Sequence, residues 1–491
     1  MSVKSVKTDL KQSKPRVRFA PSPTGMPHIG NTRTALFNYL FAKHDGGKFI
    51  VRIEDTDRER YVPDSLEKIL EILKAVGIKW DEGPEVGGPF APYEQSKRLK
   101  LYRERAEELV KRGKAYYCFC TKERLEKLRQ SQQKKGQRPR YDGNCRRLSK
   151  VEVERRLAAR EAVVIRLKVP DSGETVWEDL IDGKIAFKNE LLDDQVLLKS
   201  DGFPTYHLGV VVDDHEMEIT HILRGAEWIS STPKHLLLYQ AFGWQAPAIG
   251  HFSVILGSDK KKLSKRHGAK SVLDYLAEGY LPEALVPFMA YLGWSYQDNS
   301  QLLTMNELIT HFSLQRLQKQ NPIFDIAKLN YFNGKAIRAL VVEELVKRMQ
   351  PFVPANWKAS EVKLKQIAPL IKDRLVTLKE VESLADFFFT KPLVDRQLIL
   401  KYAQHEGEAV RDYLDKVKTV IGGMKEFGVT ELESGLRELV GAIGWEPRAA
   451  FMTLRLVIMG KEATPPLFET LKVIGRDETL DRLSYARSSF S

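Results

Sequence analysis

Strand-like and helix-like segments alternate through about the first 110 residues, and this alternation limits the possible folds more than any other feature of the chain. Short apolar strands are expected at residues 17–20 and 49–53, and apolar residues recur at helical spacing over residues 28–43, 63–76 and 96–111. Alternating strands and helices are typical of a doubly wound parallel sheet, in which ligands bind at the carboxyl ends of the strands. We therefore predict an α/β domain with a ligand site after its first strand.

The alternation stops at residues 116–202, where short strand candidates follow a polar, basic stretch. The clearest candidates are residues 163–169 and 195–198. We interpret this segment as an α+β insertion. Signals that we expect to complete the parallel sheet then resume. They are strand and loop signals at residues 205–212 and 219–223 and an apolar helix at residues 233–242.

Almost every segment after residue 273 has the periodicity of an amphipathic helix. Clear examples are residues 281–292, 336–349 and 448–459, with a polar break at residues 405–408. A chain of 491 residues exceeds what one hydrophobic core usually serves, so several domains are expected. We predict an all-α region for the final third, in which no catalytic motif is visible.

The charge and the cysteine content restrict the partners and the compartment. A formal net charge of +13 and an isoelectric point near 9.3 favour a polyanionic partner, because each cation placed on a phosphate releases counterions. The sequence has no apolar run of bilayer length and only three cysteines, so a soluble protein of the reducing cytoplasm is expected. Residues 1–15 are expected to be a disordered basic tail. A transit peptide is the alternative, but Asp9 and the absence of arginine before Pro15 argue against it.

A turn rich in glycine and proline follows the first strand, in the segment Pro21-Ser-Pro-Thr-Gly-Met-Pro-His-Ile-Gly-Asn31. Gly25 and Gly30 allow a ligand to approach the backbone closely, and the helix N-terminus after the turn offers unpaired N–H groups to phosphate. Residues 25–32 resemble the phosphate-binding loop G-x-x-x-x-G-K-[ST], but Asn31 occupies the position of the lysine. An ordinary turn is the alternative, and it would not explain His28 at the start of the helix.

A dense group of cations lies far along the chain, in Lys260-Lys-Lys-Leu-Ser-Lys-Arg-His-Gly268. Such a loop suits closure over a polyphosphate, and a solvated basic loop is the alternative. Together with the first turn it resembles the HIGH and KMSKS signatures of class I aminoacyl-tRNA synthetases, here His28-Ile-Gly-Asn31 and Lys262-Leu-Ser-Lys-Arg266. The resemblance implies a Rossmann-like catalytic domain that uses ATP. It implies catalytic roles for His28, Gly30, Lys262 and Lys265, and ATP contacts for Pro21, Thr24, Gly25, His28, Gly30, Glu227 and Lys265.

Longer segments narrow the resemblance to glutamyl-tRNA synthetases of the bacterial type. They are Arg18-Phe-Ala-Pro-Ser-Pro-Thr-Gly, Arg52-Ile-Glu-Asp-Thr-Asp-Arg58, Tyr206-His-Leu-Gly-Val-Val-Val-Asp-Asp-His215 and Arg224-Gly-Ala-Glu-Trp228. The resemblance implies that glutamate is bound by Arg18, Ser22, Glu54, Tyr206 and Arg224. The chemistry agrees, because a guanidinium suits a γ-carboxylate and Glu54 suits the substrate ammonium. A structural ion pair or hydrogen bond is the alternative for each residue.

The reaction that this resemblance implies is an ATP-dependent ligation. The α-carboxylate of glutamate attacks the α-phosphate of ATP, and the glutamyl group then passes from the adenylate to the terminal ribose of tRNA-Glu. No protein nucleophile is needed, so catalysis would come from alignment and from cations that meet developing phosphate charge. We assign His28 and the helix start to the ATP phosphates, Lys262 and Lys265 to the leaving pyrophosphate, and Mg²⁺ as the bridging ion.

The three cysteines, Cys118, Cys120 and Cys145, lie around a basic part of the insertion. Their arrangement resembles the zinc site of some synthetases in this family, and zinc takes four ligands. Some relatives supply a histidine two residues after the third cysteine, where this chain has Arg147. Tyr141 is the candidate fourth ligand, as in a shorter paralogue of the family. Three reduced, metal-free thiols are the alternative.

Contacts with tRNA are expected in two places. Residues 121–150 hold eleven Lys or Arg against three acidic residues, which suits an acceptor-stem contact. A solvated helix and loop is the alternative there. The helical region from about residue 329 corresponds to the anticodon-binding domain of the bacterial enzymes, and the resemblance places Arg374 where the last anticodon base is read.

The expected organisation is a catalytic domain in two halves, residues 16–115 and 203–328, with stem-contact helices in the second half. An acceptor-stem-binding insertion separates the halves at residues 116–202, and a helical anticodon-binding domain follows at residues 329–491. A monomer is the expectation that the family carries.

Three rival functions remain open from the sequence. Glutaminyl-tRNA synthetases usually end in β-barrels, and the shorter paralogue that modifies a tRNA base lacks an anticodon domain. A non-catalytic RNA-binding protein would tolerate loss of His28 and Lys265, and both are present.

Overall fold

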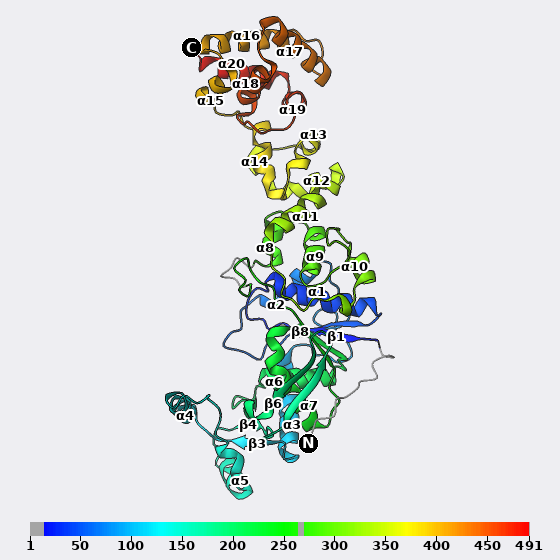
Figure 1. Ribbon diagram of the computed structural model, residues 1–491, viewed down its shortest axis with the longest axis vertical. Helices are drawn as coiled ribbons and strands as arrows, with labels where there is room; N and C mark the ends of the chain where they lie inside the picture. The colour runs from blue at the N-terminus through cyan, green and yellow to red at the C-terminus, as the bar shows by residue number, and fades with distance from the viewer. Residues whose placement is uncertain (1–13, 264–269, 491) are drawn as a thin grey trace. The chain divides into compact units, whose positions relative to one another are not determined.

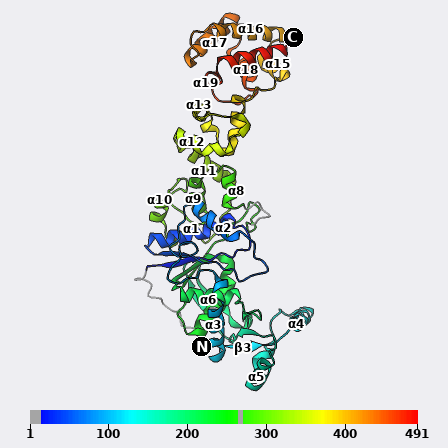
Figure 2. The same ribbon diagram turned by 180° about the vertical axis from the view of Figure 1, so that it is seen from behind.

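The computed structural model describes residues 14–263 and 270–490 (Figures 1 and 2). Most of the expected basic tail lies outside the described residues, and so does Lys265. Contacts within the chain define two units. The first contains residues 1–274 and 285–325, and the second contains residues 275–284 and 326–491.

Parallel strands form the centre of the first unit, and the α/β prediction is confirmed. β1 (Arg16–Phe19) pairs with β2 (Lys48–Val51), and β8 (His221–Gly225) pairs with β9 (Ala248–Phe252), both in parallel. The N–H of Thr220 donates a hydrogen bond of 3.0 Å to the Arg16 carbonyl and joins the start of β8 to β1. The carboxyl ends of β1, β2 and β8 therefore lie at one edge, where a ligand site is expected.

Helices cover both sides of these strands, as Figures 1 and 2 show. On one side lie α1 (Ile29–His44) and α2 (Ser65–Ala75), and on the other lie α3 (Leu99–Lys111) and α6 (Tyr206–Glu216). The short helix η1 (Gln95–Lys97) precedes α3, and η4 (Ala226–Ser231) leads from β8 into α7 (Thr232–Phe242).

The expected strand and loop at residues 205–212 is wrong, because these residues begin helix α6. The run Val210-Val211-Val212 favours a strand locally. In the folded chain these valines and Leu208 are buried on the helix, which also places Asp213 and Asp214 in the interior. Both carboxylates are paired with arginines from distant segments, so tertiary contacts outweigh local propensity here.

A three-stranded antiparallel sheet forms the centre of the inserted segment. Its strands, in the order β3-β4-β7, are β3 (Ala115–Cys118), β4 (Val164–Leu167) and β7 (Val196–Leu198). Two helices of this segment, α4 (Lys122–Lys134) and α5 (Lys150–Ala158), have no buried residue. The short helices η2 (Asn144–Arg147) and η3 (Asn189–Leu191) complete the segment.

Two strands from the same stretch of sequence join the parallel strands instead. β5 (Glu174–Asp179) runs parallel to β9, with Asp179 opposite Ile249, and β6 (Gly183–Lys188) pairs antiparallel with β5. The order of this sheet is β6-β5-β9-β8. The end of β5 therefore lies beside β9, with Asp179 level with Ile249, which in turn pairs with Ile222 of β8.

Short helices follow the sheet in the chain. They are α8 (Val272–Ala277), α9 (Pro282–Tyr291), α10 (Met305–His311) and η6 (Leu314–Arg316). Within the described residues, no helix has the length and apolar character needed to cross a membrane.

All the secondary structure of residues 326–490, which form most of the second unit, is helical. Its first half contains α11 (Ile326–Ala339), α12 (Val342–Met349), η7 (Gln350–Phe352), η8 (Ala355–Trp357), α13 (Glu361–Ile371), η9 (Lys372–Arg374), η10 (Leu378–Glu380), α14 (Val381–Ala385) and η11 (Asp386–Phe388). Its second half contains α15 (Arg396–Ala403), α16 (Gly407–Gly423), α17 (Val429–Ile443), α18 (Pro447–Met459), α19 (Leu467–Ile474) and α20 (Arg476–Ser488). The prediction of an all-α final third is confirmed.

The expected helix at residues 336–349 is in fact the end of α11 and the whole of α12. The break falls at Leu340 and Val341, where Val341 has extended backbone angles and caps α12. The apolar spacing continues across the break, so periodicity alone does not reveal it.

Candidate active site

The first turn of α1 is closed by a reciprocal cap between His28 and Asn31. The Gly30 N–H donates to Nδ1 of His28 at 3.0 Å, and the His28 N–H donates to Oδ1 of Asn31 at 3.2 Å. The His28 ring lies so close to Gly30 that a Cβ on Gly30 would be 2.8 Å from its Cε1 atom. Asn31 occupies the position of the lysine in a phosphate-binding loop. Here it instead accepts a hydrogen bond that helps to hold His28 at the N-terminus of α1.

A cavity of about 450 Å³ lies at the carboxyl ends of β1 and β8 and beside this turn. All five residues expected to bind glutamate line it: Arg18, Ser22, Glu54, Tyr206 and Arg224. Three of the residues expected to contact ATP in the turn also line it, namely Pro21, Thr24 and Gly25. One cavity thus brings together the residues expected for the amino acid and part of those expected for the nucleotide.

A smaller cavity adjoins the start of α1. His28, Gly30, Glu227, Lys262 and other residues line it, and Glu227 also lines the larger cavity. Nζ of Lys262 lies 3.2 Å from Oε1 of Glu227. The first turn and the lysine-rich segment, more than 230 residues apart, therefore meet at this point.

Arg18 is held by a carboxylate. Its Nε and Nη2 atoms donate to the two oxygens of Asp214 at 3.0 and 3.3 Å, and both side chains are buried. Asp214 also accepts from Nη1 of Arg52 at 2.7 Å, and Nη2 of Arg52 donates to Glu54 at 3.0 Å. The result is a buried network of two guanidiniums and two carboxylates.

Burial raises and ion pairing lowers the pKa of the two carboxyl groups in this network. For Asp214, burial acts to raise the pKa, but Arg18 and Arg52 outweigh it and hold the pKa below its ordinary value. For Glu54, burial is the larger effect, and its pKa is raised despite Arg52 and Arg18. Glu54 lines the cavity, so it is the carboxylate of this network that a ligand can reach.

Arg224 is held in a different way from Arg18. Its hydrogen-bond acceptors in the described chain are two imidazoles, a phenol, a hydroxyl and a backbone carbonyl. The phenol belongs to Tyr206, whose pKa burial raises to about 12, so it remains protonated. Trp228 packs on Tyr206, with ring centroids 4.5 Å apart.

Several residues of this site do not follow from motif reasoning on the sequence. Asp213, Asp214 and Trp228 fall within the segments that carry the resemblance, but the motifs indicate no role for them. His235 and His251 lie outside those segments. An apolar strand or helix that contains a single histidine was the only available signal, and such histidines are common in cores.

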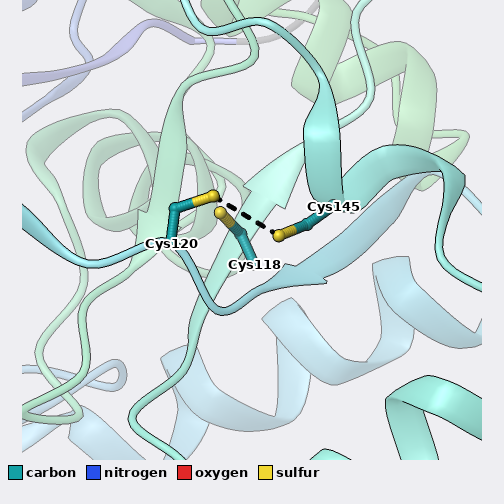
Figure 3. A group of neighbouring side chains, drawn as sticks. All are labelled: Cys118, Cys120 and Cys145. Atoms are coloured by element: carbon teal, nitrogen blue, oxygen red, sulfur yellow. Dashed lines mark hydrogen bonds between the residues drawn. The ribbon is translucent and has the colours of Figure 1, made fainter. Parts of the chain in front are cut away.

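The three cysteine thiols of the insertion converge, as Figure 3 shows. The sulfur atoms of Cys118, Cys120 and Cys145 all lie within 4.8 Å of one another. Oη of Tyr141 lies 3.4 Å from the Cys118 sulfur and 3.5 Å from the Cys120 sulfur, and it accepts from the Cys145 N–H at 2.8 Å. Arg147 ends the short helix η2 next to this group.

Arg374 ends η9 in the second unit and donates to the Thr464 carbonyl at 2.8 Å. Arg455, from α18, donates to the Pro465 carbonyl at 2.8 Å and also to Thr464. The pKa of Arg455 is lowered by burial and then by the charge of Arg374. The two guanidiniums therefore share the Thr464 carbonyl as an acceptor, and neither forms an ion pair with a carboxylate in the described part of the chain. Arg455 gave no signal in the sequence beyond its place in a helix.

The sequence of this chain is similar to those of known proteins over nearly its whole length. The model for the catalytic domain of class I tRNA synthetases (E and Q) matches residues 14–331, and an anticodon binding domain model matches residues 344–487. A glutamate–tRNA ligase of Dehalococcoides mccartyi is 44% identical over 482 residues, 97% of this chain and 98% of the relative. One from Borreliella burgdorferi is 41% identical, over 96% of this chain and 98% of the relative.

A solved structure agrees with these relatives. The crystal structure of a glutamate tRNA ligase from Elizabethkingia meningosepticum, in complex with its amino acid, has a TM-score of 0.91 and 36% identity. It covers 98% of this chain and 100% of that chain. The fold and the site define a class I aminoacyl-tRNA synthetase. Within that class, the chain belongs to the glutamate–tRNA ligase family.

Proposed function

We propose that this enzyme joins L-glutamate to tRNA-Glu in two steps. An oxygen of the glutamate α-carboxylate attacks the α-phosphorus of ATP, which releases pyrophosphate and leaves glutamyl-adenylate. A hydroxyl of the terminal tRNA ribose then attacks the glutamyl carbonyl carbon, and AMP leaves. The observation that carries the proposal is one cavity that contains Glu54, Arg18 and Arg224 beside the glycine-containing turn at the start of α1.

The cavity suits an amino acid with an acidic side chain. Glu54 can pair with the ammonium group, and two guanidiniums can meet the carboxylates of the substrate. Ser22 and Tyr206 offer hydroxyl groups in the same wall. We assign all five residues, Arg18, Ser22, Glu54, Tyr206 and Arg224, to the glutamate site.

The second cavity suits the phosphates of ATP. The N-terminus of α1 and Lys262 face it, and both favour negative charge. We assign Pro21, Thr24, Gly25, His28, Gly30 and Glu227 to ATP, and Lys262 with Lys265 to the leaving pyrophosphate. The enzyme contributes alignment and charge to the reaction, since neither step needs a covalent enzyme intermediate.

Mg²⁺ fits this part of the site. Glu227 is a carboxylate at the junction of the two cavities and could hold the ion, which takes few protein ligands when it binds with nucleotide phosphates. When bound, Mg²⁺ neutralises charge on the phosphate oxygens.

The cysteine group of the insertion fits zinc. Three thiols and the Tyr141 hydroxyl converge, which supplies the four donors that a structural zinc site needs. We propose Cys118, Cys120, Tyr141 and Cys145 as the ligands. Elemental analysis of the purified enzyme should give about one zinc per chain. Less than roughly a tenth of an equivalent would leave the alternative of three metal-free thiols.

The tRNA would contact both units. The exposed, basic helix α4 suits the acceptor stem, and Arg374 with its neighbour Arg455 suits the last anticodon base. We infer that the enzyme is a monomer. We also infer that it acts in the cytoplasm, which is supported by three thiols without a disulfide in the described chain. Size-exclusion chromatography with light scattering tests the monomer.

An aminoacylation assay with glutamate and glutamine, each on tRNA-Glu and tRNA-Gln, tests the main proposal. We expect glutamate to be attached to tRNA-Glu in an ATP-dependent way. Attachment of glutamine to tRNA-Gln would support the glutaminyl rival, and failure of glutamate on every tRNA would overturn the proposal.

A further inference from the structure

Arg224 carries a positive charge that no carboxylate neutralises by direct contact within residues 14–263 and 270–490. Its side chain is 6% exposed and lies at the end of β8 in the wall of the larger cavity. Burial lowers its pKa, as expected for a cation that is held away from water. A buried cation of this kind is costly unless a ligand anion compensates it.

Neutral acceptors fix the orientation of this guanidinium. Nε points to a ring nitrogen of an imidazole, and each terminal nitrogen has two acceptors. The acceptors are Nε2 of His251 at 3.3 Å, Oη of Tyr206 at 3.3 Å, Nδ1 of His235 at 3.2 Å, Oγ1 of Thr232 at 2.8 Å and the carbonyl of Trp228 at 3.4 Å. All of them hold the group in place, and none cancels its charge.

The position of one proton on His251 follows from these contacts. The Nε–H of Arg224 can only donate, so Nε2 of His251 must accept and cannot carry a proton. The proton of the neutral ring is therefore on Nδ1, which lies 2.6 Å from Oδ2 of Asp179. Asp179 and His251 are 3% and 1% exposed, so water does not compete for this hydrogen bond.

Asp179 is itself fixed by the backbone. Its Oδ1 atom accepts from the N–H groups of Ile181, Asp182 and His251 at 3.1, 3.1 and 3.2 Å. Burial acts to raise its pKa, but the hydrogen bonds outweigh this and hold the pKa below its ordinary value. The carboxylate at the end of β5 is therefore a permanent acceptor for the His251 ring.

His235 is oriented in a matching way. Its Nδ1 accepts from Arg224, so its Nε2 carries the proton and donates to Nδ1 of His207 at 3.0 Å. Burial and then nearby cations lower the pKa of His207 to about 3 and lower that of His235 strongly. Both rings are neutral at physiological pH, and neither adds charge to the pocket.

We propose that Asp179 and His251 are positioning residues for the glutamate substrate. Asp179 holds His251 as the Nδ1–H tautomer, and this ring then orients the Arg224 guanidinium while its full positive charge stays available to a substrate carboxylate. A carboxylate in direct contact with Arg224 would orient it equally well but would cancel that charge. The inference rests on the proposed function only for the identity of the ligand.

The isosteric substitution Asp179→Asn tests whether Asp179 orients Arg224 through the tautomer of His251. Asn keeps an oxygen for the three backbone N–H groups and turns an amide donor toward Nδ1 of His251, so the ring must move its proton to Nε2. Two donors, Nε2–H and the Arg224 Nε–H, then face each other. We expect the KM for glutamate to rise about tenfold or more in aminoacylation of tRNA-Glu, with KM for ATP and for tRNA within about twofold of wild type.

Asp81→Asn is the control, because Asp81 also accepts from a side chain and a backbone N–H, those of Lys43 and Phe49 beside β2, and lines neither cavity. Replacement of His251 separates the hydrogen bond from the packing. His251→Gln keeps an acceptor within reach of Arg224 and should retain more glutamate affinity than His251→Leu, which has none.

Nitrogen-15 NMR of histidine-labelled enzyme reads the tautomer directly, with the His251→Gln variant assigning the signal. We expect the proton on Nδ1 in the wild type and on Nε2 in Asp179→Asn. A wild-type Nε2–H tautomer would overturn the inference. So would a glutamate KM in Asp179→Asn equal to that of Asp81→Asn, or an equal rise of all three KM values, which would indicate a structural role only.

The two proposals can fail separately. If the wild-type enzyme attaches glutamate to no tRNA, the proposed function fails while the NMR result still decides the tautomer. If the wild type is active but the tautomer is Nε2–H, only the positioning role fails.

Discussion

Arg18 and Arg224 line the same cavity and are buried to nearly the same extent, 4% and 6% exposed, but they are held by opposite kinds of partner. Arg18 forms a two-point ion pair with Asp214, whereas Arg224 is surrounded by neutral acceptors. A buried ion pair satisfies its own charge and fixes the wall of a site. A buried cation with neutral acceptors is fixed equally well and still needs an anion. The comparison shows that residue type and burial alone do not tell an arginine whose charge is already paired within the protein from one whose charge is left for a ligand.

The largest effect is expected on the Arg18 side, and it is an effect on stability. Asp214→Asn removes the charge that pairs with both Arg18 and Arg52 in the interior. Breaking a buried pair leaves uncompensated charge, so the free energy of unfolding should fall by about 3–5 kcal/mol. Urea unfolding measures this, with Asp81→Asn as the control. Equal stability of the two variants would show that the network does not stabilise the fold.

The pH dependence of this difference has a definite sign. The pKa of Asp214 is lowered in the folded state, so its contribution is present above its unfolded pKa of about 3.9 and is lost as the pH falls through the folded value. The stability difference between wild type and Asp214→Asn should therefore stay constant near neutral pH and shrink in acid.

A large effect on activity, with little effect on stability, is expected on the Arg224 side. Arg224→Gln removes the uncompensated charge but keeps some hydrogen-bonding capacity. We expect kcat/KM for glutamate to fall roughly 100- to 1000-fold, because the substrate carboxylate loses its charged partner. The free energy of unfolding should be unchanged or higher, since a buried cation is removed. If Arg224→Gln instead unfolds more easily than wild type and keeps its KM for glutamate, Arg224 stabilises the fold and does not bind the substrate.

Glu54 belongs to the buried ion-pair network of Arg18 and also lines the larger cavity, so the pH dependence of glutamate binding tests its role. Its pKa is raised by burial, so it takes up a proton at a higher pH than an ordinary glutamate. A protonated Glu54 cannot pair with the substrate ammonium, and the KM for glutamate should rise about tenfold per pH unit below that pKa. The pH profile of Glu54→Gln, measured in parallel, should lack this acid limb. An identical limb in both enzymes would assign it to another group.

The smallest effect is expected for the pair of arginines in the second unit. Arg374 and Arg455 also meet without a carboxylate, as Arg224 does, but they are more exposed to water. Arg374→Ala should raise the KM for tRNA-Glu about fivefold and leave the KM for ATP and glutamate unchanged, because one hydrogen bond to a charged group is lost. A change in the glutamate KM instead would contradict an anticodon role.

Much of the framework was predictable from local pattern. The strands at residues 17–20 and 49–53 and the helix that begins near His28 all appear, because apolar spacing and a glycine-rich turn are local signals. Local pattern does not predict helix α6, because Val210-Val211-Val212 favours a strand, and it does not predict the break before Val342, because the apolar spacing runs through it. At α6, distant ion pairs of Asp213 and Asp214 outweigh the local preference.

The residues that line the cavity could be named in the sequence, but their partners could not. Asp214 is 196 residues from Arg18, and His251 is 72 residues from Asp179. Nothing in the spacing of these residues indicates that β5, which lies within the inserted stretch of sequence, pairs with β9 and brings its terminal carboxylate to a histidine.

The sequence by itself determined the class of fold, the glycine-containing turn that we propose for the nucleotide, and the set of charged residues available to the proposed glutamate site. These depend on periodicity, on glycine at positions of close approach and on the chemistry of single side chains. Only the tertiary structure decided which arginine is neutralised and which is left charged. The physical reason is that the charge state of a buried site depends on which groups come within hydrogen-bond distance, and chain topology, not sequence separation, sets those distances.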